Sequence, residues 1–231
     1  MKFTHAEVLE VATLTAFVKK VVLKPTTAVS FKAGQYLQVV MGEKDKRPFS
    51  IASAPDDSNN IELHIGATPE NAYAYDVLTK AIETKTLDIE VGLGDAYLRE
   101  NTHPLIIVAG GTGYSYAKSI LYHVISAQPE RPVTLYWGAK QLADLYEFEA
   151  LEALSKLNPH FIFVPVVETP EQDWAGKTGL VHEAVLDDID DLSSHEVYTA
   201  GRFEMAATIR DTFIPKGLDK ERLFGDAYAF I

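Results

Sequence analysis

The sequence has 231 residues, with 21 basic and 33 acidic side chains and a formal net charge of −12. A surface of this charge repels nucleic acid and anionic lipid, so neither is an expected partner. The chain contains no cysteine, which excludes disulfides, thiolate nucleophiles and cysteine-bound metal centres, so any redox chemistry needs an organic cofactor.

No apolar run approaches the roughly 20 residues that a membrane helix needs. The first residues, Met1 to Glu7, lack the basic and then apolar pattern of a secretory signal. We therefore expect a cytoplasmic protein without a membrane partner. The sequence leaves the oligomeric state open.

Short β-type runs separated by turn signals fill about the first 90 residues. The six predicted strands are Glu7–Val11, Phe17–Leu23, Tyr36–Val40, Phe49–Ala52, Ile61–Ile65 and Leu87–Val91. One turn is marked by the polar run Asp56-Asp57-Ser58-Asn59-Asn60, and a helix is predicted within Ala72–Ile82. The spacing of the strands predicts a small antiparallel barrel or sandwich.

From Pro104 onward the pattern alternates between strand and helix. The predicted strands are Leu105–Val108, Val133–Trp137, Phe161–Val167, Val197–Thr199 and Asp226–Ile231. The predicted helices are one along the apolar stripe from Ala117 to Ile125, then Leu145–Leu157, Leu180–Leu186 and Glu204–Phe213. This alternation predicts a doubly wound parallel sheet, and we place the domains at residues 1–100 and 101–231.

The most informative loop reads Ala109-Gly110-Gly111-Thr112-Gly113-Tyr114-Ser115, between a predicted buried strand and a predicted helix. Glycines allow a sharp turn and a close approach to a ligand, and the helix start offers N–H groups to a pyrophosphate. A plain strand-to-helix turn does not need three glycines in four positions. The loop therefore predicts nucleotide binding, although its spacing differs from the G-x-G-x-x-G of ordinary dehydrogenases.

A second motif reads Arg47-Pro48-Phe49-Ser50, on a predicted barrel strand. Alone it would fit an edge-strand proline beside a surface arginine. Together with the glycine loop, it resembles the flavin reductases of the ferredoxin-NADP reductase superfamily. The resemblance implies an antiparallel six-stranded flavin-binding barrel, followed by a doubly wound NAD(P)H-binding domain. It also places the Ser50 hydroxyl near flavin N5 and the Phe49 ring against the flavin.

The resemblance continues along the chain. Leu63–Gly66 is similar to the second flavin-contacting strand, and Tyr136–Lys140 to the strand end near the adenosine ribose. Tyr198–Met205 resembles the second pyridine-nucleotide loop, and Leu223–Ile231 the tail of bacterial NAD(P)H-flavin reductases. His64 could equally be a packed structural histidine.

The resemblance implies a set of site residues. The flavin-binding candidates are Tyr36, Arg47, Pro48, Phe49, Ser50, His64, Ile65 and Gly66. The nucleotide-binding candidates are Gly110, Gly111, Thr112, Gly113, Tyr114, Ser115, Lys140, Gly201, Arg202 and Phe203. Ser50 and Asp226 are the catalytic candidates, although Asp226 could equally lie in a solvated acidic turn. No metal is expected.

The implied activity is hydride transfer from NADH or NADPH to free riboflavin, FMN or FAD. Relatives that hold FAD tightly carry a Gly-x-x-Ser/Thr segment after the second flavin strand, whereas this chain reads Gly66-Ala67-Thr68-Pro69-Glu70-Asn71. Pro69 removes a backbone donor and Glu70 adds negative charge beside any phosphate. We therefore expect flavin to act as a diffusing substrate. The sequence does not fix the preferred nucleotide or flavin.

Three other functions compete with this reading. The chain could be a reductase subunit that passes electrons to a protein partner, such as a flavin-dependent acceptor enzyme. It could be a binding subunit without activity. Gly113-Tyr114-Ser115-Tyr116-Ala117 also nearly fits the nucleophile elbow of a serine hydrolase, with His182 or His195 as the histidine of a triad. That reading leaves Arg47–Ser50 unexplained.

Overall fold

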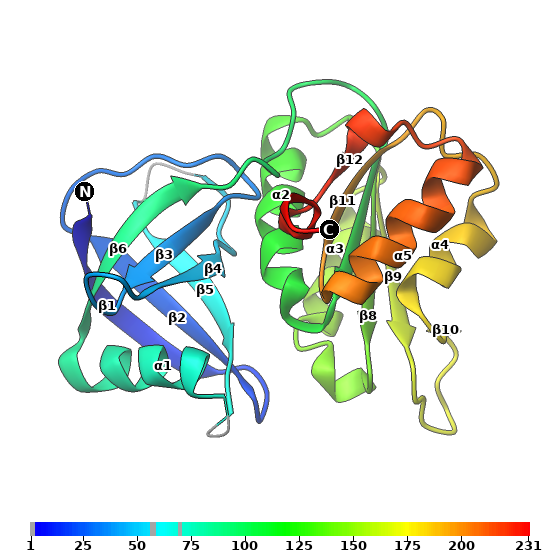
Figure 1. Ribbon diagram of the computed structural model, residues 1–231. Coiled ribbons are helices and arrows are strands. Elements are labelled where there is room, and N and C mark those ends of the chain that lie inside the picture. The colour runs from blue at the N-terminus through cyan, green and yellow to red at the C-terminus, as the bar shows by residue number, and fades with distance from the viewer. Residues whose placement is uncertain (1–2, 56–58, 69–70) are drawn as a thin grey trace.

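The computed structural model describes residues 3–55, 59–68 and 71–231. Two β-sheets lie side by side, with the N-terminal sheet on the left of Figure 1 and the C-terminal sheet on the right. The predicted boundary at residues 100 and 101 falls in the connection between the last strand of the first sheet and the first strand of the second. Residues 56–58 of the predicted turn, and Pro69 and Glu70 of the argument on flavin binding, lie outside the described residues.

The N-terminal half is an antiparallel barrel with strand order β4-β3-β6-β1-β2-β5. Its strands are β1 (Thr4–Thr13), β2 (Val18–Pro25), β3 (Tyr36–Val40), β4 (Lys46–Ser50), β5 (Ile61–Gly66) and β6 (Thr86–Leu93). A bridge between Ile51 and Leu63 joins the two edge strands. The Ala52 N–H adds a hydrogen bond of 2.7 Å to the Glu62 carbonyl. The edges of the sheet thus meet, as in a small closed barrel.

Helix α1 (Ala72–Thr84) covers one end of the barrel. Its apolar stripe, which includes Val77 and Ala81, packs into the barrel core with Leu37, Leu63 and Leu87. The burial of this stripe against the barrel stabilises the segment as a helix, although Tyr73, Tyr75 and Ile82 stay exposed on its outer face.

The C-terminal half is a sheet with strand order β10-β9-β8-β7-β11-β12, and every neighbouring pair is parallel. Its strands are β7 (Leu105–Gly110), β8 (Val133–Ala139), β9 (Phe161–Val167), β10 (Lys177–Thr178), β11 (Glu196–Ala200) and β12 (Leu223–Phe224). Its helices are α2 (Tyr114–Ala127), α3 (Phe148–Leu157), α4 (Val181–Asp188) and α5 (Phe203–Phe213). This is the doubly wound arrangement that the sequence predicts.

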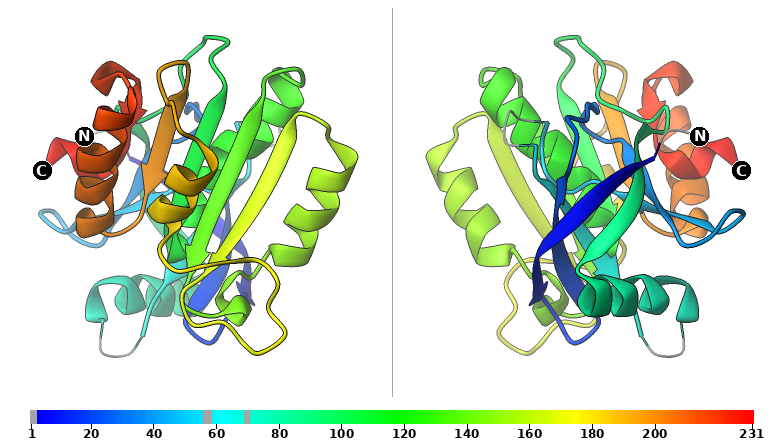
Figure 2. Two further views of the ribbon diagram at one scale, coloured as in Figure 1. Left: turned by 90° about the vertical axis from the view of Figure 1, so that its right-hand side faces the viewer. Right: turned by 90° about the vertical axis from the view of Figure 1, so that its left-hand side faces the viewer.

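Helices cover both faces of this sheet, as the turned views in Figure 2 show. Along β7, Leu105 and Ile107 face the core beneath α2 and α3, whereas Ile106 and Val108 face the core beneath α4 and α5. A strand buried on both faces must be apolar at every position, which is the pattern that identified this segment in the sequence. The strand order reverses between β7 and β11, and crevices at such points bind ligands.

One predicted element is wrong, and the starts of others are displaced: for example, the helix predicted from Leu145 begins at Phe148, and the fourth barrel strand also begins elsewhere. Asp226–Ile231 is not a strand: β12 ends at Phe224, and Asp226–Ala229 forms the 3-10 helix η5. The register pairs Phe224 with Tyr198, so a longer β12 would soon run past the end of β11. The fourth barrel strand begins at Lys46 rather than Phe49 because β3 pairs with Lys46–Ser50. In the part of the chain that the structure describes, none of the helices has the length and apolar composition to traverse a bilayer.

Candidate functional site

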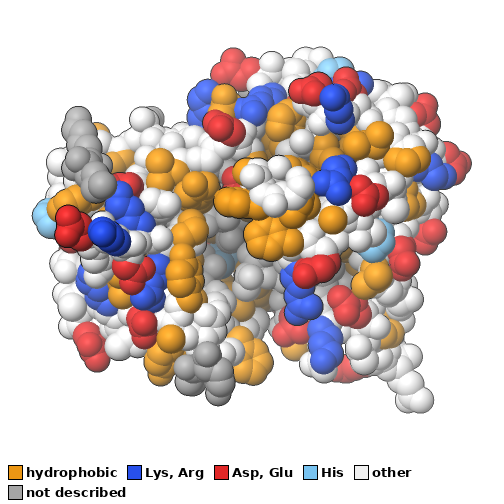
Figure 3. Space-filling model, viewed as in Figure 1, with side chains coloured by type: hydrophobic (Ala, Val, Ile, Leu, Met, Phe, Trp, Pro, Cys, Tyr) orange, Lys and Arg blue, Asp and Glu red, His pale blue; other side chains and the backbone are white. Residues whose placement is uncertain are grey.

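A cleft of about 1190 Å³ opens between the barrel and the parallel sheet. Its barrel wall includes Pro48, Phe49 and Ser50 of β4. The opposite wall is formed by the loops that follow β7 and β11, which are the two strands at the point where the strand order reverses. Figure 3 shows the furrow between the two halves, with hydrophobic side chains along its borders and mixed charges elsewhere on this face. The predicted flavin and nucleotide motifs therefore face one another across one cavity.

The glycine loop takes a shape that larger residues could not adopt. Gly111 has φ 53°, and a Cβ placed there would have no neighbouring atom within 4 Å, so its backbone is open to the cleft. A Cβ at Gly113 would collide with the carbonyl of Ala200 at the end of β11. The Met205 side chain packs against both Gly110 and Gly201. Close packing between the two loops therefore requires these glycines, while Gly111 remains open to a ligand.

Ser50 lies at the end of β4, where its backbone pairs with Tyr36 of β3. Its side chain borders the cleft and makes no hydrogen bond with any of the described residues. The Tyr36 ring packs against Gly94, and Asp226 approaches the same glycine. Tyr36 itself does not line the cleft.

Asp226 borders the cleft from η5. Its burial, reinforced by the negative charge of Asp95, raises the pKa of Asp226 to about 6. Burial together with the two carboxylates also raises the pKa of Tyr36. A carboxyl group whose pKa lies near neutrality can exchange a proton in the working pH range. The solvated acidic turn that the sequence left open does not fit this partly buried position.

Arg47 turns away from the cleft. Its guanidinium binds Asp45 through two hydrogen bonds of 2.9 and 2.7 Å, from Nε and Nη2. Nη1 donates to the Tyr73 carbonyl at 2.6 Å and lies 3.3 Å from Asp76. Two carboxylates therefore surround this cation already.

The three candidate residues of the second flavin motif have different surroundings. The His64 ring is fully buried, with Nδ1 3.0 Å from the Tyr146 hydroxyl and Nε2 2.7 Å from a Glu62 oxygen. Ile65 packs in the barrel core. Gly66 faces the glycine loop, because a Cβ there would lie 3.0 Å from Thr112 Cγ2.

Comparison with known proteins now decides the family. A family model described as "Oxidoreductase NAD-binding domain" matches residues 107–211. An NAD(P)H-flavin reductase from Aliivibrio fischeri is 50% identical over 219 residues, covering 92% of each chain. An NAD(P)H-flavin reductase from Vibrio harveyi is 48% identical with the same coverage. The chain belongs to the NAD(P)H-flavin reductase family.

The fold of this flavin reductase family member also matches solved structures. A cytochrome P450 reductase from Amycolatopsis superposes with a TM-score of 0.89 and 25% identity, over 97% of this chain and 69% of that one. The superposition extends over both halves of the chain, so the arrangement of barrel and parallel sheet is shared.

Of the remaining nucleotide-binding candidates in this flavin reductase, some line the cleft and others lie outside it. Lys140 and Arg202 line the cleft, whereas the exposed Phe203 packs against Phe230 outside it. Tyr114 is fully buried below the loop, where its ring stacks on Trp137 at a centroid distance of 3.9 Å. Its side chain supports the loop from beneath.

The serine hydrolase alternative is not supported. The Ser115 hydroxyl donates to the Thr112 carbonyl at 3.1 Å, and none of the described histidines forms a hydrogen bond with it. The relatives found are reductases. The hydroxyl of Ser115 therefore closes the first turn of α2.

Sequence reasoning missed several residues that line the cleft. Thr15 and Phe17 come from the β1–β2 hairpin, Glu168 follows β9, and His182 lies in the first turn of α4. None belongs to a motif with a fixed spacing. A position at the carboxyl end of β9 was the only signal that could have indicated Glu168.

Proposed function

We propose that the protein is an NAD(P)H:flavin oxidoreductase that transfers a hydride from NADH or NADPH to free flavin. The observation that carries this proposal is the single cavity shared by Ser50 of the barrel and the glycine loop of the parallel sheet. The contact between Gly66 and Thr112 sets the two walls close together at one point. A cavity of this kind can hold two planar rings in contact, which is the main requirement of hydride transfer.

In the proposed reaction, nicotinamide C4 gives a hydride to flavin N5, so the nicotinamide loses two electrons and the flavin gains them. The Ser50 hydroxyl donates a hydrogen bond to N5 and orients the ring. Thr112 faces the nicotinamide, and the open backbone at Gly111 binds the nucleotide phosphates. Asp226, with a pKa of about 6, can exchange a proton with the reduced flavin at the edge of the cavity. A cytoplasmic location is part of the same proposal.

We further propose that flavin diffuses in and out as a substrate. The state of Arg47 supports this, because its guanidinium is bound by Asp45 and lies beside Asp76. A cation that two carboxylates already neutralise adds little attraction for a phosphate. Contacts with the isoalloxazine ring then dominate recognition, so riboflavin, FMN and FAD all serve as acceptors.

The nucleotide end of the cleft supports acceptance of both NADH and NADPH. Two cations, Lys140 and Arg202, line the cleft, but the acidic residues Asp144, Glu168 and Glu204 line it as well. A dedicated site for a 2′-phosphate usually needs a bidentate arginine or several cations. We expect the turnover efficiencies with the two nucleotides to differ by less than about a hundredfold, or roughly 2.7 kcal/mol.

The deciding experiment is anaerobic bleaching of added riboflavin, FMN or FAD by NADH or NADPH in the presence of purified protein. We expect all three flavins to be bleached and the isolated protein to be nearly colourless. Stoichiometric flavin that survives gel filtration would contradict the substrate role. Absence of bleaching with every combination would contradict the activity itself.

A second candidate is electron transfer to a protein partner, such as a flavin-dependent acceptor enzyme. The exposed pair Phe203 and Phe230, next to Arg202 at the edge of the cleft, favours it as an apolar surface near the site. The candidates separate in one assay with cytochrome c as an artificial acceptor. Reduction that needs added flavin supports the first proposal, and reduction without added flavin supports the second.

A further inference from the structure

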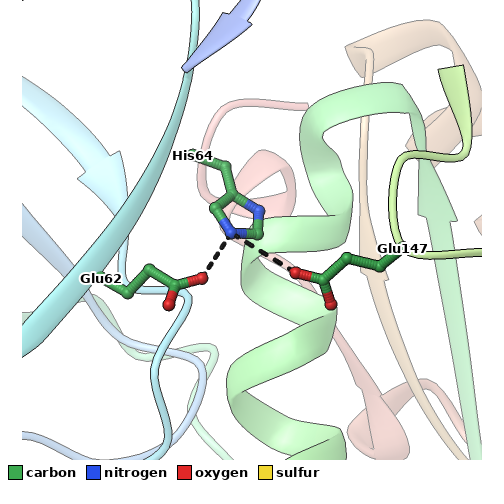
Figure 4. Close-up of side chains that lie close together, drawn as sticks. All are labelled: Glu62, His64 and Glu147. Carbon is green, nitrogen blue, oxygen red and sulfur yellow. Dashed lines mark hydrogen bonds and ion pairs between the residues drawn. The ribbon is translucent and has the colours of Figure 1, made fainter. Parts of the chain in front are cut away.

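A cluster of charged and aromatic side chains lies where the barrel meets the parallel sheet, outside the hydride-transfer residues named above. Glu62 and His64 come from β5 of the barrel, and Glu147 comes from the residue before α3 (Figure 4). Lys118 projects from α2 between the two carboxylates. We call these four residues the junction cluster.

Short contacts hold the junction cluster together. Lys118 Nζ lies 2.8 Å from Glu62 Oε1 and 2.6 Å from Glu147 Oε1, so one ammonium joins the two halves of the molecule. The His64 ring adds its contact with Glu62. The Tyr114 hydroxyl donates to Glu147 at 2.7 Å, which ties the cluster to the first residue of α2.

The cluster is largely removed from water. The side chains of Lys118, Glu62 and Glu147 are 16%, 22% and 17% exposed. Burial opposes ionisation of Glu62, but the hydrogen bond from His64 and the Lys118 ammonium hold the pKa of Glu62 at about 2. Glu62 is therefore an anion at neutral pH, and it accepts a hydrogen bond from His64 Nε2–H.

The junction cluster connects the two ligand-binding surfaces by short paths. Helix α2 begins directly after the glycine loop, and Lys118 lies about one turn into it. On the other side, the Glu62 carbonyl accepts from the Ala52 N–H, two residues beyond Ser50. The Ser119 hydroxyl of α2 donates to the Ser53 carbonyl at 2.8 Å in the same region. A displacement of α2 from β5 would therefore change the spacing between the glycine loop and Ser50.

Stability alone is a poor reason to keep such a cluster. Desolvation offsets much of the attraction within a buried ion pair, and well-packed apolar residues often stabilise a fold equally well. The ammonium and the two carboxylates instead hold β5 and α2 in a defined geometry.

We propose that Lys118 is a positioning residue, whose ammonium fixes β5 and α2 at the separation that hydride transfer between nucleotide and flavin requires. This inference rests on the proposed function, because its effect appears in the hydride-transfer step. Lys118 is not among the residues that line the cleft; it acts through Glu62 and Glu147.

The donor atoms around Lys118 suggest a specific test. One atom each from Glu62, His64 and Glu147 lies within 4.8 Å of the others, which is a spacing that could hold a metal ion. Histidine nitrogen and carboxylate oxygen are both ligands that bind zinc in proteins. In the intact protein the ammonium already contacts both carboxylates. Lys118→Ala would leave two uncompensated anions and room for a divalent cation to replace the missing charge.

The experiment measures anaerobic single-turnover hydride transfer to riboflavin, with NADH and with NADH deuterated at C4, alongside the melting temperature. We expect Lys118→Met to slow hydride transfer at least tenfold and to increase the isotope effect, while the Kd of NADH changes less than threefold. Lys118→Arg should restore most of the rate. Lys156→Met, at an exposed ion pair on α3, is the matched control and should leave the rate unchanged.

Lys118→Ala should bind Co²⁺ with a visible absorption band, and Zn²⁺ should restore at least part of its rate. A Lys118→Met protein that melts earlier but transfers hydride at the parent rate would overturn the proposal. The proposal would also be overturned if Lys118→Ala bound Co²⁺ but Zn²⁺ did not raise its rate of hydride transfer. If the single variants fail to fold, Glu62→Gln/Lys118→Met/Glu147→Gln removes all three charges, and a parent rate in that variant would also overturn the proposal. Lack of flavin reduction by the unmodified protein would instead contradict the proposed function.

Discussion

Gly66 of the barrel and Thr112 of the glycine loop meet so closely that a Cβ at Gly66 would lie 3.0 Å from Thr112 Cγ2. The contact joins β5 to the loop after β7, two segments that lie far apart in the sequence and belong to different sheets. It brings the second flavin motif against the nucleotide loop. Because residue 66 is glycine, with no side chain, the two walls of the cleft can lie this close together.

We expect Gly66→Ala to slow anaerobic hydride transfer about tenfold, because the added methyl group displaces Thr112 by a few tenths of an ångström. The melting temperature should change by less than about 3 °C. Gly42→Ala is the matched control, since its Cβ would lie 3.9 Å from the nearest neighbour, the Asp45 Cβ. Parent-level hydride transfer by Gly66→Ala would show that this contact does not set the ring spacing.

Ser50→Ala should slow hydride transfer tenfold or more and leave the melting temperature nearly unchanged. The hydroxyl borders the cleft and makes no hydrogen bond with the described residues, so its loss removes little from the fold. Losing a donor that acts mainly in the transition state costs roughly 2.7–4 kcal/mol, against about 1 kcal/mol for an ordinary hydrogen bond. Stopped-flow bleaching of riboflavin gives the rate, and Ser126→Ala on α2 is the control. A lower melting temperature with an intact rate would assign Ser50 a purely structural role.

Asp226→Asn should stabilise the protein at neutral pH. The folded protein raises the pKa of Asp226 from 3.8 to about 6, so the folded state binds the proton more tightly than the unfolded state. The native carboxylate therefore lowers stability progressively as pH rises from about 4 to 6. Melting curves across pH 4 to 8 should show the variant gaining on the order of 2 kcal/mol above pH 6 and nothing at pH 4. Asp187→Asn, at an exposed position on α4, is the matched control.

Arg131→Met should destabilise the fold strongly without impairing the chemistry of the folded molecules. The guanidinium and Glu196 are 3% and 1% exposed and lie 2.7 Å apart. Removing one partner of a buried pair leaves an unpaired charge and costs about 3–5 kcal/mol. The pair lies near the starts of β8 and β11, at the end of the sheet opposite the cleft. Denaturant unfolding should show the loss, and Arg131→Met/Glu196→Gln should recover part of it.

The fold was largely predictable because its elements have local signatures. The apolar run of β7 and the glycines after it identify a buried parallel strand and a ligand loop from neighbouring residues alone. The prediction of a strand at Asp226–Ile231 was wrong because the apolar residues there have a composition typical of strands. Whether a segment pairs depends on its partner, and β11 ends too soon to pair with it. That information is absent from the local pattern.

The site was only partly predictable for the same reason. Ser50 and the glycine loop belong to motifs, and both line the cleft. The junction cluster draws on β5, α2 and the segment before α3, and no short pattern in the sequence joins Glu62, Lys118 and Glu147. Likewise, nothing near Arg47 indicates that the carboxylate of Asp76, on α1, lies beside its guanidinium.

Helix α2 contacts both proposed ligand sites. The nucleotide loop leads directly into its first turn, and its Lys118 and Ser119 side chains bind the barrel residues Glu62 and Ser53. The positions of the flavin site and the nucleotide site therefore both depend on the position of α2. If binding of the nucleotide shifts this helix and alters the affinity for flavin, thermodynamic reciprocity requires flavin to alter the nucleotide affinity by the same factor. A measured coupling between the two dissociation constants would thus report directly on how rigidly α2 is held.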